Sequence, residues 1–278
     1  MVYFKVIVFL SLIFSHIQSY ANEIDSSCLT LIKNNQCLNA LEVCRVDAEQ
    51  GDPKAQTALG MLLSGITHGD FRKNYKQSFY WVQLAAEQGY SKAQLAIAEM
   101  YMNGQVVPMN AKKAKVWYEQ AAAQENLDGI NGLARQYRYG TGVRKDYEKA
   151  FQYYQQAALK GHTRSQVGLG LSYRDAKGVK KNMVKAYAWL LIAAEKIDKQ
   201  RLQAIEKHYK DERDNLDQTL PQCKHLSRLD QMSETMAIGY AKKLLFDLKQ
   251  RMSIKQINKA KKLALEIKKE RAFTRSVL

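Results

Sequence analysis

The sequence is poor in the residues that catalysis, metal binding or chain breaking would require. Its 278 residues include three prolines, four cysteines and five histidines, and none of the cysteines lies between residues 51 and 199. The histidines fall in separate segments without the spacing of metal ligands, and no G-x-S-x-G, H-E-x-x-H or phosphate-binding loop motif occurs. We therefore expect few long disordered tracts, no catalytic residue, no metal site and no cofactor.

What the sequence has instead is a repeat of 36 residues. An aromatic residue recurs at this interval, and a pair of alanines follows each one four residues later; the aromatic residues are Trp81, Trp117, Tyr153 and Trp189. A fixed period in this range is typical of stacked helix–turn–helix units, because no single unit can bury its own apolar face. We expect these aromatic residues to pack between helices rather than to contact a ligand.

Glycines mark where the helices of each unit should end. Tyr137 precedes the glycine-bearing turn that starts at Gly140, and Gly89 and Gly161 follow the alanine pairs of their units. A helix commonly ends in a left-handed residue, a conformation that glycine adopts without strain. Glu125 stands where Gly89 and Gly161 end their helices, so we expect a local departure in geometry there.

The repeated pattern resembles a known family. The elements Ala-Gln-x-x-Leu-Gly-x-x-Tyr, Gly-x-Gly-Val and Ala-x-x-Trp/Tyr-x-x-x-Ala-Ala-x-x-Gly are similar to those of the Sel1-like repeat, a relative of the tetratricopeptide repeat. The third copy, whose turn is residues 140–143, is the clearest. The resemblance implies an all-α, right-handed α/α solenoid with four repeats over residues 51–199. A helical half-repeat over residues 22–50 would precede them, and a basic helical cap over residues 200–278 would follow.

The first 21 residues have the pattern of a secretory signal peptide. Lys5 precedes an apolar run over residues 6–14, and a small-x-small cleavage site ends at Ala21. The alternative is a membrane anchor, but a transmembrane helix needs about 20 apolar residues and this run is shorter. We therefore expect residues 1–21 to be removed and the mature protein to be periplasmic or secreted.

The even number of cysteines favours disulfides in an oxidising compartment. Cys37 and Cys44 are seven residues apart on one expected helix, about 10.5 Å along its axis, which exceeds the reach of a disulfide. A turn at residues 34–35 would bring Cys28 within about one helical turn of Cys44, so Cys28–Cys44 is the favoured bridge. The cysteines could instead be small buried apolar residues, and the pairing of Cys37 and Cys223 stays open.

The net charge of +16 is concentrated towards the C-terminus, where twelve basic and three acidic residues follow from Lys242 onward. Ser253 and Gln256 form a capping box, so we expect helices on both sides of it and a polar loop over residues 211–228 before them. These helices could be a cap with a solvated face, or they could bind an anionic membrane surface or an anionic envelope polymer. We do not expect nucleic acid as a ligand of these helices, because the sequence has no recognition motif and its N-terminus predicts export.

The resemblance places the first helix of each unit on a concave surface. Residues two before, two after and five after the leucine or isoleucine of each first helix should face inward. The residues expected to contact a partner are Glu99, Met102, Asn131, Arg135, Arg138, Tyr139, Arg164 and Arg174. Arginine forks bind carboxylates through two parallel hydrogen bonds, so we expect an acidic segment or the C-terminus of another protein as the ligand. The alternative is that these arginines are scattered solvated charges.

The expected function is that of a non-catalytic scaffold or regulator in the cell envelope, which binds a protein partner in the concave groove. A second interpretation is a binder of an anionic envelope polymer or membrane surface through the C-terminal helices. A third is a β-lactamase-like hydrolase, as suggested for cysteine-rich relatives of this repeat. The cysteine pairs of those relatives lie within each repeat, whereas the four repeats here contain none, so the hydrolase is the weakest interpretation.

Overall fold

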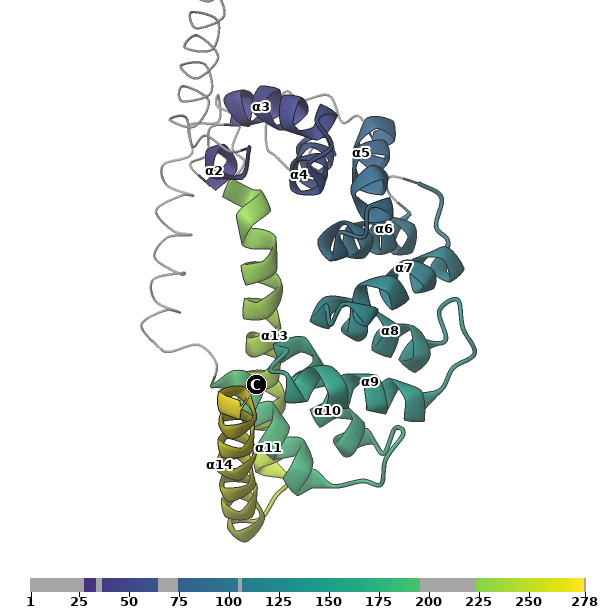
Figure 1. The fold of residues 1–278 in the computed structure, drawn as a ribbon. Helices are drawn as coiled ribbons and strands as arrows, with labels where there is room; N and C mark the ends of the chain where they lie inside the picture. Colours follow the sequence, from purple (N-terminus) through teal and green to yellow (C-terminus); the bar gives the residue numbers. More distant parts are fainter. Residues whose placement is uncertain (1–27, 34–36, 65–74, 105–106, 196–223, 278) are drawn as a thin grey trace, which may run out of the picture.

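The protein is all-α in the part that the structure describes. The computed structural model describes residues 28–33, 37–64, 75–104, 107–195 and 224–277, and no strand occurs within them (Figure 1). The helices are α2 (Cys28–Lys33), α3 (Cys37–Glu49), α4 (Pro53–Leu63), α5 (Tyr75–Glu87), α6 (Ser91–Asn103), α7 (Ala111–Ala123), α8 (Leu127–Tyr139), α9 (Tyr147–Leu159), α10 (Thr163–Asp175), α11 (Met183–Ala194), α13 (Lys224–Gln250) and α14 (Ile254–Val277).

The helices from α2 to α11 stack into an arc. Each of them packs on the helix that follows it in sequence. The pairs α4–α5, α6–α7, α8–α9 and α10–α11 form the two-helix units of the repeat. In Figure 1, α4, α6, α8 and α10 lie on the inner side of the arc, and α5, α7 and α9 lie on its outer side. The all-α solenoid expected from the sequence is therefore confirmed.

The turns inside the second, third and fourth units are built by contacts that repeat with the sequence. In the third unit, the Asp146 carboxylate accepts a hydrogen bond from the Lys149 backbone N–H at 2.9 Å and so caps α9. The Asp146 N–H donates to the Tyr137 carbonyl at 2.9 Å, and the Lys149 ammonium lies 5.4 Å from the centre of the Tyr137 ring. The same contacts recur 36 residues before and after, with Tyr101, Asn110 and Lys113 and with Tyr173, Asn182 and Lys185.

Glycines allow the helices of neighbouring units to approach closely. Tyr118 of α7 packs on Gly132 of α8, where an added Cβ would lie 2.5 Å from the ring, and Tyr154 of α9 packs in the same way on Gly168 of α10, at 2.6 Å. Tyr118 and Tyr154 are buried, whereas Trp117 is half-buried between two apolar clusters. The repeated aromatic residues do pack between helices, but the deepest burial falls one residue later in the middle units.

Left-handed residues end the second helices, as the glycine pattern indicates. The angle φ is 87° at Gly89 and 96° at Gly161, and Glu125 at the equivalent position between them has φ 61°. This conformation costs a residue other than glycine about 1–2 kcal/mol. The Glu125 carboxylate pairs with the Lys160 ammonium of the next unit at 2.5 Å. Glu125 therefore keeps the left-handed geometry of the two glycines, and the departure in geometry expected there is not found; the difference is the strain of a residue that has a side chain.

A disulfide fixes the N-terminal end of the arc. Cys28 of α2 and Cys44 of α3 are bonded, with their Cα atoms 4.6 Å apart, which is the bridge that the sequence favoured. Both cysteines are buried in an apolar cluster that extends to α4. Residues 1–21, where a signal peptide is expected, and Cys223 lie outside the described residues, as does the side chain of Cys37.

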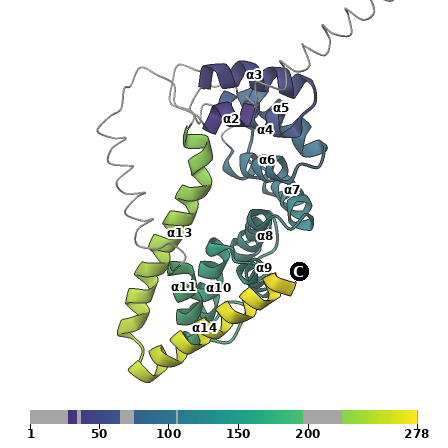
Figure 2. The same ribbon diagram turned by 60° about the vertical axis from the view of Figure 1, so that its left-hand side comes forward.

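The C-terminal helices do more than cover the last unit. α14 packs along α11, whereas α13 contacts α10 and α11 towards one end and reaches α2 at the other. α13 therefore crosses the open side of the arc, as both views show (Figures 1 and 2). None of the described helices has the length and apolar character needed to cross a bilayer.

The start of α14 follows the predicted capping box. The Ser253 hydroxyl accepts a hydrogen bond from the Gln256 N–H at 3.3 Å, and the Gln256 side-chain oxygen accepts one from the Ser253 N–H at 3.0 Å. The loop predicted over residues 211–228 is wrong at its C-terminal end, because α13 already begins at Lys224 and its first turns extend towards α2. The polar composition of this stretch favoured a loop, whereas the helix found there contacts elements that are far away in the sequence.

Candidate functional site

A pocket opens between the first helices of the second and third units. It has a volume of about 360 Å³ and lies between α6 and α8; the residues that line it are Glu99, Met102, Asn103, Tyr118, Gly132, Arg135, Gln136, Tyr139 and Thr141. Four of the eight residues expected to contact a partner are among them, namely Glu99, Met102, Arg135 and Tyr139. Because α6 and α8 lie on the inner side of the arc, this pocket belongs to the concave surface (Figure 1).

The floor of the pocket is well packed and partly polar. Gly132 has no side chain, so the ring of Tyr118 reaches the floor from α7. Burial raises the pKa of Tyr118 to about 12, so its hydroxyl keeps its proton at neutral pH. The Gln136 amide donates to the Ala111 carbonyl at 2.8 Å and to the Met102 sulfur at 3.5 Å. Its oxygen Oε1 has no hydrogen-bond partner among the described residues.

The mouth of the pocket carries charges of both signs. Arg135 and Glu99 are exposed and hold the same position in successive units, 36 residues apart. Among the ion pairs between described residues, none involves Arg135. Tyr139 is 63% exposed and lies one turn further along the same face of α8. The pocket therefore presents a guanidinium group, a carboxylate and an aromatic ring to a ligand.

At the equivalent place between α8 and α10, charged side chains of the protein pair with one another. Asp175 accepts two hydrogen bonds from Arg174, at 2.6 Å from Nε and 3.0 Å from Nη2, and lies 3.8 Å from Nη2 of Arg138. The hydrogen bond from Arg174 outweighs the effect of burial and lowers the pKa of Asp175, so the carboxylate stays ionised. The anion expected between Arg138 and Arg174 is thus part of the protein itself, and both arginines have an internal partner.

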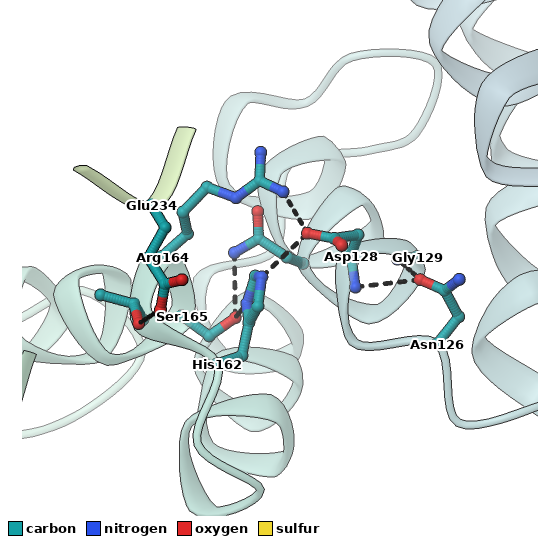
Figure 3. A network of polar contacts seen from close by, with 9 residues as sticks. Asn126, Asp128, Gly129, His162, Arg164, Ser165 and Glu234 are labelled. Atoms are coloured by element: carbon teal, nitrogen blue, oxygen red, sulfur yellow. Dashed lines mark hydrogen bonds and ion pairs between the residues drawn. The ribbon is translucent and has the colours of Figure 1, made fainter. Parts of the chain in front are cut away.

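Asn131 and Arg164 belong to a second internal network, and Figure 3 shows Arg164 beside Asp128 in it. Asp128, in the first turn of α8, accepts a hydrogen bond from Nε2 of His162 at 2.9 Å and pairs with Arg164. Asn131 is 5% exposed, and its amide donates to the Ser165 hydroxyl at 2.9 Å. The expectation that Asn131 faces a ligand is not met, because the position two before the leucine packs against the next unit.

The network around Asp128 joins three helices. The side-chain oxygen of Asn126 accepts from the backbone N–H groups of Asp128 and Gly129, both at 3.1 Å, and so caps α8. Burial by itself raises the pKa of Asp128, but the hydrogen bond from His162 and the charge of Arg164 outweigh it and lower the pKa. At the start of α10, the Thr163 hydroxyl donates to Glu234 of α13 at 2.9 Å. The fourth unit and α13 are therefore joined by polar contacts as well as by apolar packing.

Ser165, His162 and Asp128 are hydrogen-bonded in the sequence of a Ser-His-Asp catalytic triad, but a substrate cannot reach the serine. Ser165 is 0% exposed, so a substrate carbonyl cannot reach its hydroxyl. With Nε2 protonated, His162 donates to Asp128, and its Nδ1 accepts from Ser165 at 2.8 Å, so the three groups satisfy one another. The arrangement holds α8 against α10. Within the described residues, no cluster of three or more His, Cys, Asp or Glu side chains could hold a metal ion.

The sequence contained a signal for Asp175 that the sequence analysis did not use. That reasoning missed five residues of the pocket and two internal acids, namely Asn103, Tyr118, Gly132, Gln136 and Thr141, and Asp128 and Asp175. Asn103, Tyr139 and Asp175 hold one position at steps of 36 residues. Counting from Tyr139 would have placed an acid beside Arg174 at the end of α10.

Comparisons with known proteins identify the repeat. The family model described as the Sel1 repeat matches residues 53–90, 91–126, 127–162 and 163–198, which together are more than half of the chain. The chain is similar to a protective antigen present in uropathogenic Escherichia coli strains that displays an SLR fold, with 30% identity and a TM-score of 0.54 over 62% of this chain and 36% of that chain. It is also similar to a Sel1 repeat protein from Oxalobacter formigenes, with 29% identity and a TM-score of 0.54 over 66% of this chain and 74% of that one. The match thus spans about a third of the E. coli protein, and no curated protein matches the chain significantly.

Proposed function

We propose that this chain, which belongs to the Sel1 repeat family, is a non-catalytic binding module of the cell envelope that holds a segment of another protein in the pocket between α6 and α8. Sel1 repeat proteins act in general as scaffolds for protein–protein interaction. The concave side of such a solenoid is a continuous surface on which an extended partner can lie. The proposal assigns the partner to one part of that surface.

The observation that carries the proposal is the state of Arg135. It is exposed at the mouth of a pocket that also contains Glu99 and Tyr139, and no ion pair between described residues involves it. The other three arginines predicted to bind a partner are paired with Asp128 or Asp175. Exposed arginine and tyrosine side chains that line one pocket are typical of the anchors of protein interfaces.

The assignment to the envelope rests on the cysteines and on the N-terminal sequence. Disulfides such as Cys28–Cys44 persist in oxidising compartments and are rare in the cytosol. The pattern of residues 1–21 is that of a secretory signal peptide. Mass spectrometry of the mature N-terminus checks this part: cleavage after Ala21 supports export, and an intact protein that remains in the cytosol overturns it.

Site-specific cross-linking tests the pocket. A photoreactive phenylalanine at position 139 reports on the inner side of the arc, and the same residue at position 116 on α7 is a matched control, because Tyr139 and Val116 are 63% and 51% exposed. We expect a partner adduct from position 139 that Arg135→Glu abolishes, and a weaker or no adduct from position 116. An adduct from position 139 that is insensitive to Arg135→Glu would contradict the proposal.

A second candidate function is contact with an anionic membrane surface through α13 and α14. Phe246, Ile254 and Leu265 are 65%, 78% and 58% exposed. They lie among exposed basic residues, which include Lys255, Lys259, Lys262 and Lys269. Apolar side chains among lysines suit a lipid headgroup region, where each lysine contributes about 1 kcal/mol, better than they suit a polymer that offers charge alone.

Co-sedimentation with vesicles tests this candidate. Vesicles that contain phosphatidylglycerol should bind the protein, and the variant Phe246→Ser/Ile254→Ser should bind them less. The same variant should keep its affinity for polyglutamate, because that contact depends on charge alone. Equal binding of both proteins to vesicles would favour an anionic polymer, and no binding to either probe would remove this candidate.

A further inference from the structure

The inner side of the arc differs between its two ends because α13 crosses it (Figures 1 and 2). At α10 the inner face is partly covered: Leu171, at the position of Glu99 and Arg135 one unit on, is half-buried against the apolar cluster that contains Ala241, Leu244 and Leu248 of α13. At α6 and α8 the corresponding faces expose Glu99 and Arg135 and contain the pocket. The pocket is thus the open part of a surface whose other part α13 has partly covered.

One face of α13 is turned towards the inner side but is not buried there. α13 contacts α10, and Tyr240 and Asp247 of α13 add to the rise in the pKa of Arg174 that its hydrogen bond with Asp175 mainly causes. Met236 lies one helical turn before Tyr240 on the same face. Met236 and Tyr240 are 66% and 49% exposed, whereas Ile238 on the opposite face is 1% exposed.

We propose that α13 forms the second wall of the binding site, and that the site takes the free C-terminus of a partner protein, with its carboxylate on Arg135 and apolar side chains against Met236 and Tyr240. This inference rests on the proposed function, because it names the ligand of the same pocket. It commits to a free C-terminus where the sequence left a C-terminus and an acidic segment as alternatives.

The topology favours a free terminus over an internal segment. The arc contacts α13 at both ends, through α2 and through α10 and α11, so a segment bound on the inner side is surrounded by protein. A free terminus can enter such a ring as a single strand. An internal segment would have to enter as a doubled loop, which is wider and brings twice the number of backbone groups that need hydrogen-bond partners.

The charges of the pocket favour one carboxylate over a run of acids. The guanidinium of Arg135 can bind both oxygens of a terminal carboxylate. Glu99 holds the equivalent position on α6 and lines the same pocket, so an acidic run along the groove would meet a like charge. A neutral or basic residue before the terminus would avoid this like charge. The ligand class is therefore a C-terminal segment that is apolar or basic before its last carboxylate.

Two matched peptide libraries test the ligand class with the full-length protein. Random dodecapeptides are presented with a free C-terminal carboxylate in one library and with a C-terminal amide in the other. We expect retention from the carboxylate library, and an affinity for the best peptide that falls roughly 10- to 100-fold on amidation, which is the effect of losing a charge-assisted hydrogen-bonded pair.

Variants on the two walls separate this inference from the proposed function. Arg135→Gln should reduce binding of the selected peptide, and Met236→Ser/Tyr240→Ser should reduce it too. Phe246→Ser should not, because Phe246 is also exposed on α13 but lies about 100° away around the helix. If Arg135→Gln matters but amidation or the Met236/Tyr240 variant does not, the inference is wrong and the proposed function stands. If neither library is retained above the Arg135→Gln protein, both are wrong.

Discussion

The gap between α6 and α8 and the gap between α8 and α10 have the same helical framework, but their arginines differ in whether they have a partner within the protein. In the first gap, Arg135 has no ion pair among described residues, and a pocket of about 360 Å³ remains. In the second gap, Asp175 pairs with Arg138 and Arg174, and α13 partly covers the inner face. The position of Asp175 is that of Tyr139 one unit earlier. In this solenoid the 36-residue period fixes where the side chains lie. Which of them a ligand can reach depends on two further features, namely Asp175 in place of Tyr139 and the position of α13.

The largest effect should come from the packing that the two gaps share. Tyr118→Ala and Tyr154→Ala each remove a buried ring from above a glycine, so each should lower the free energy of unfolding by about 3–5 kcal/mol. Urea denaturation measures both. Trp117→Ala, beside Tyr118 but half-buried, should cost less. A difference of more than about 2 kcal/mol between the two tyrosine variants would show that the gaps do not share one framework.

Removal of the disulfide should weaken the packing of α13 over the gap between α8 and α10. Cys28 and Cys44 enclose a loop with a separation of 16 residues, for which about 3 kcal/mol of stabilisation is expected. Cys28→Ser/Cys44→Ser also frees α2, on which one end of α13 rests. Amide hydrogen exchange should then rise in α13 and at the inner face of α10, with little change in α6. Unchanged exchange in α13 would mean that its contact with α2 contributes nothing to the cover.

Acid should affect the second gap through its two carboxylates. The pKa values of Asp128 and Asp175 lie below their ordinary value of 3.8 in the folded protein. The stability that they contribute is therefore fully present above about pH 4 and is lost as the pH falls through the folded-state values. Urea unfolding between about pH 2 and pH 6 should show this loss below about pH 4, and Asp128→Asn/Asp175→Asn should flatten it. An equally steep loss in the double variant would place the acid sensitivity elsewhere.

The smallest effect concerns the turn that ends each first helix. Ala176 has φ 57° at the position where Gly140 has φ 73°. Ala176→Gly should stabilise the protein by about 0.5–1 kcal/mol, because relief of the left-handed strain exceeds the entropy that glycine adds to the unfolded state. Gly140→Ala is the converse change and should destabilise. Thermal unfolding of the pair checks the sign, and a stabilising Gly140→Ala would contradict it.

Much of the framework could be predicted because it is encoded locally. The helix ends at Gly89 and Gly161, the capping box of Ser253 and Gln256 and the Cys28–Cys44 bridge follow from spacings within a few turns of helix, and the 36-residue period repeats such local signals in each unit. The path of α13 could not be predicted, because it depends on docking between residues more than 60 positions apart, as in the contact of Thr163 with Glu234.

The candidate site was predicted in part for the same reason. Counting along α8 found the face that carries Arg135 and Tyr139, because a helical face is a local property. It could not tell that Asn131 on this face is buried, because the depth of a residue depends on Ser165 of the next unit. It also left Arg138 and Arg174 unpaired, because the acid between them was not included in the count.

The central claim is that Arg135 binds the ligand while the arginines of the second gap hold the fold together. Its most direct test is the dissociation constant of the selected carboxylate peptide for Arg135→Gln and Arg174→Gln, with the melting temperature of each. We predict that Arg135→Gln weakens binding roughly 10- to 100-fold at an unchanged melting temperature. Arg174→Gln should lower the melting temperature and change binding less than about twofold, because its partner is Asp175. Loss of the peptide in Arg174→Gln, with full binding in Arg135→Gln, would contradict the account.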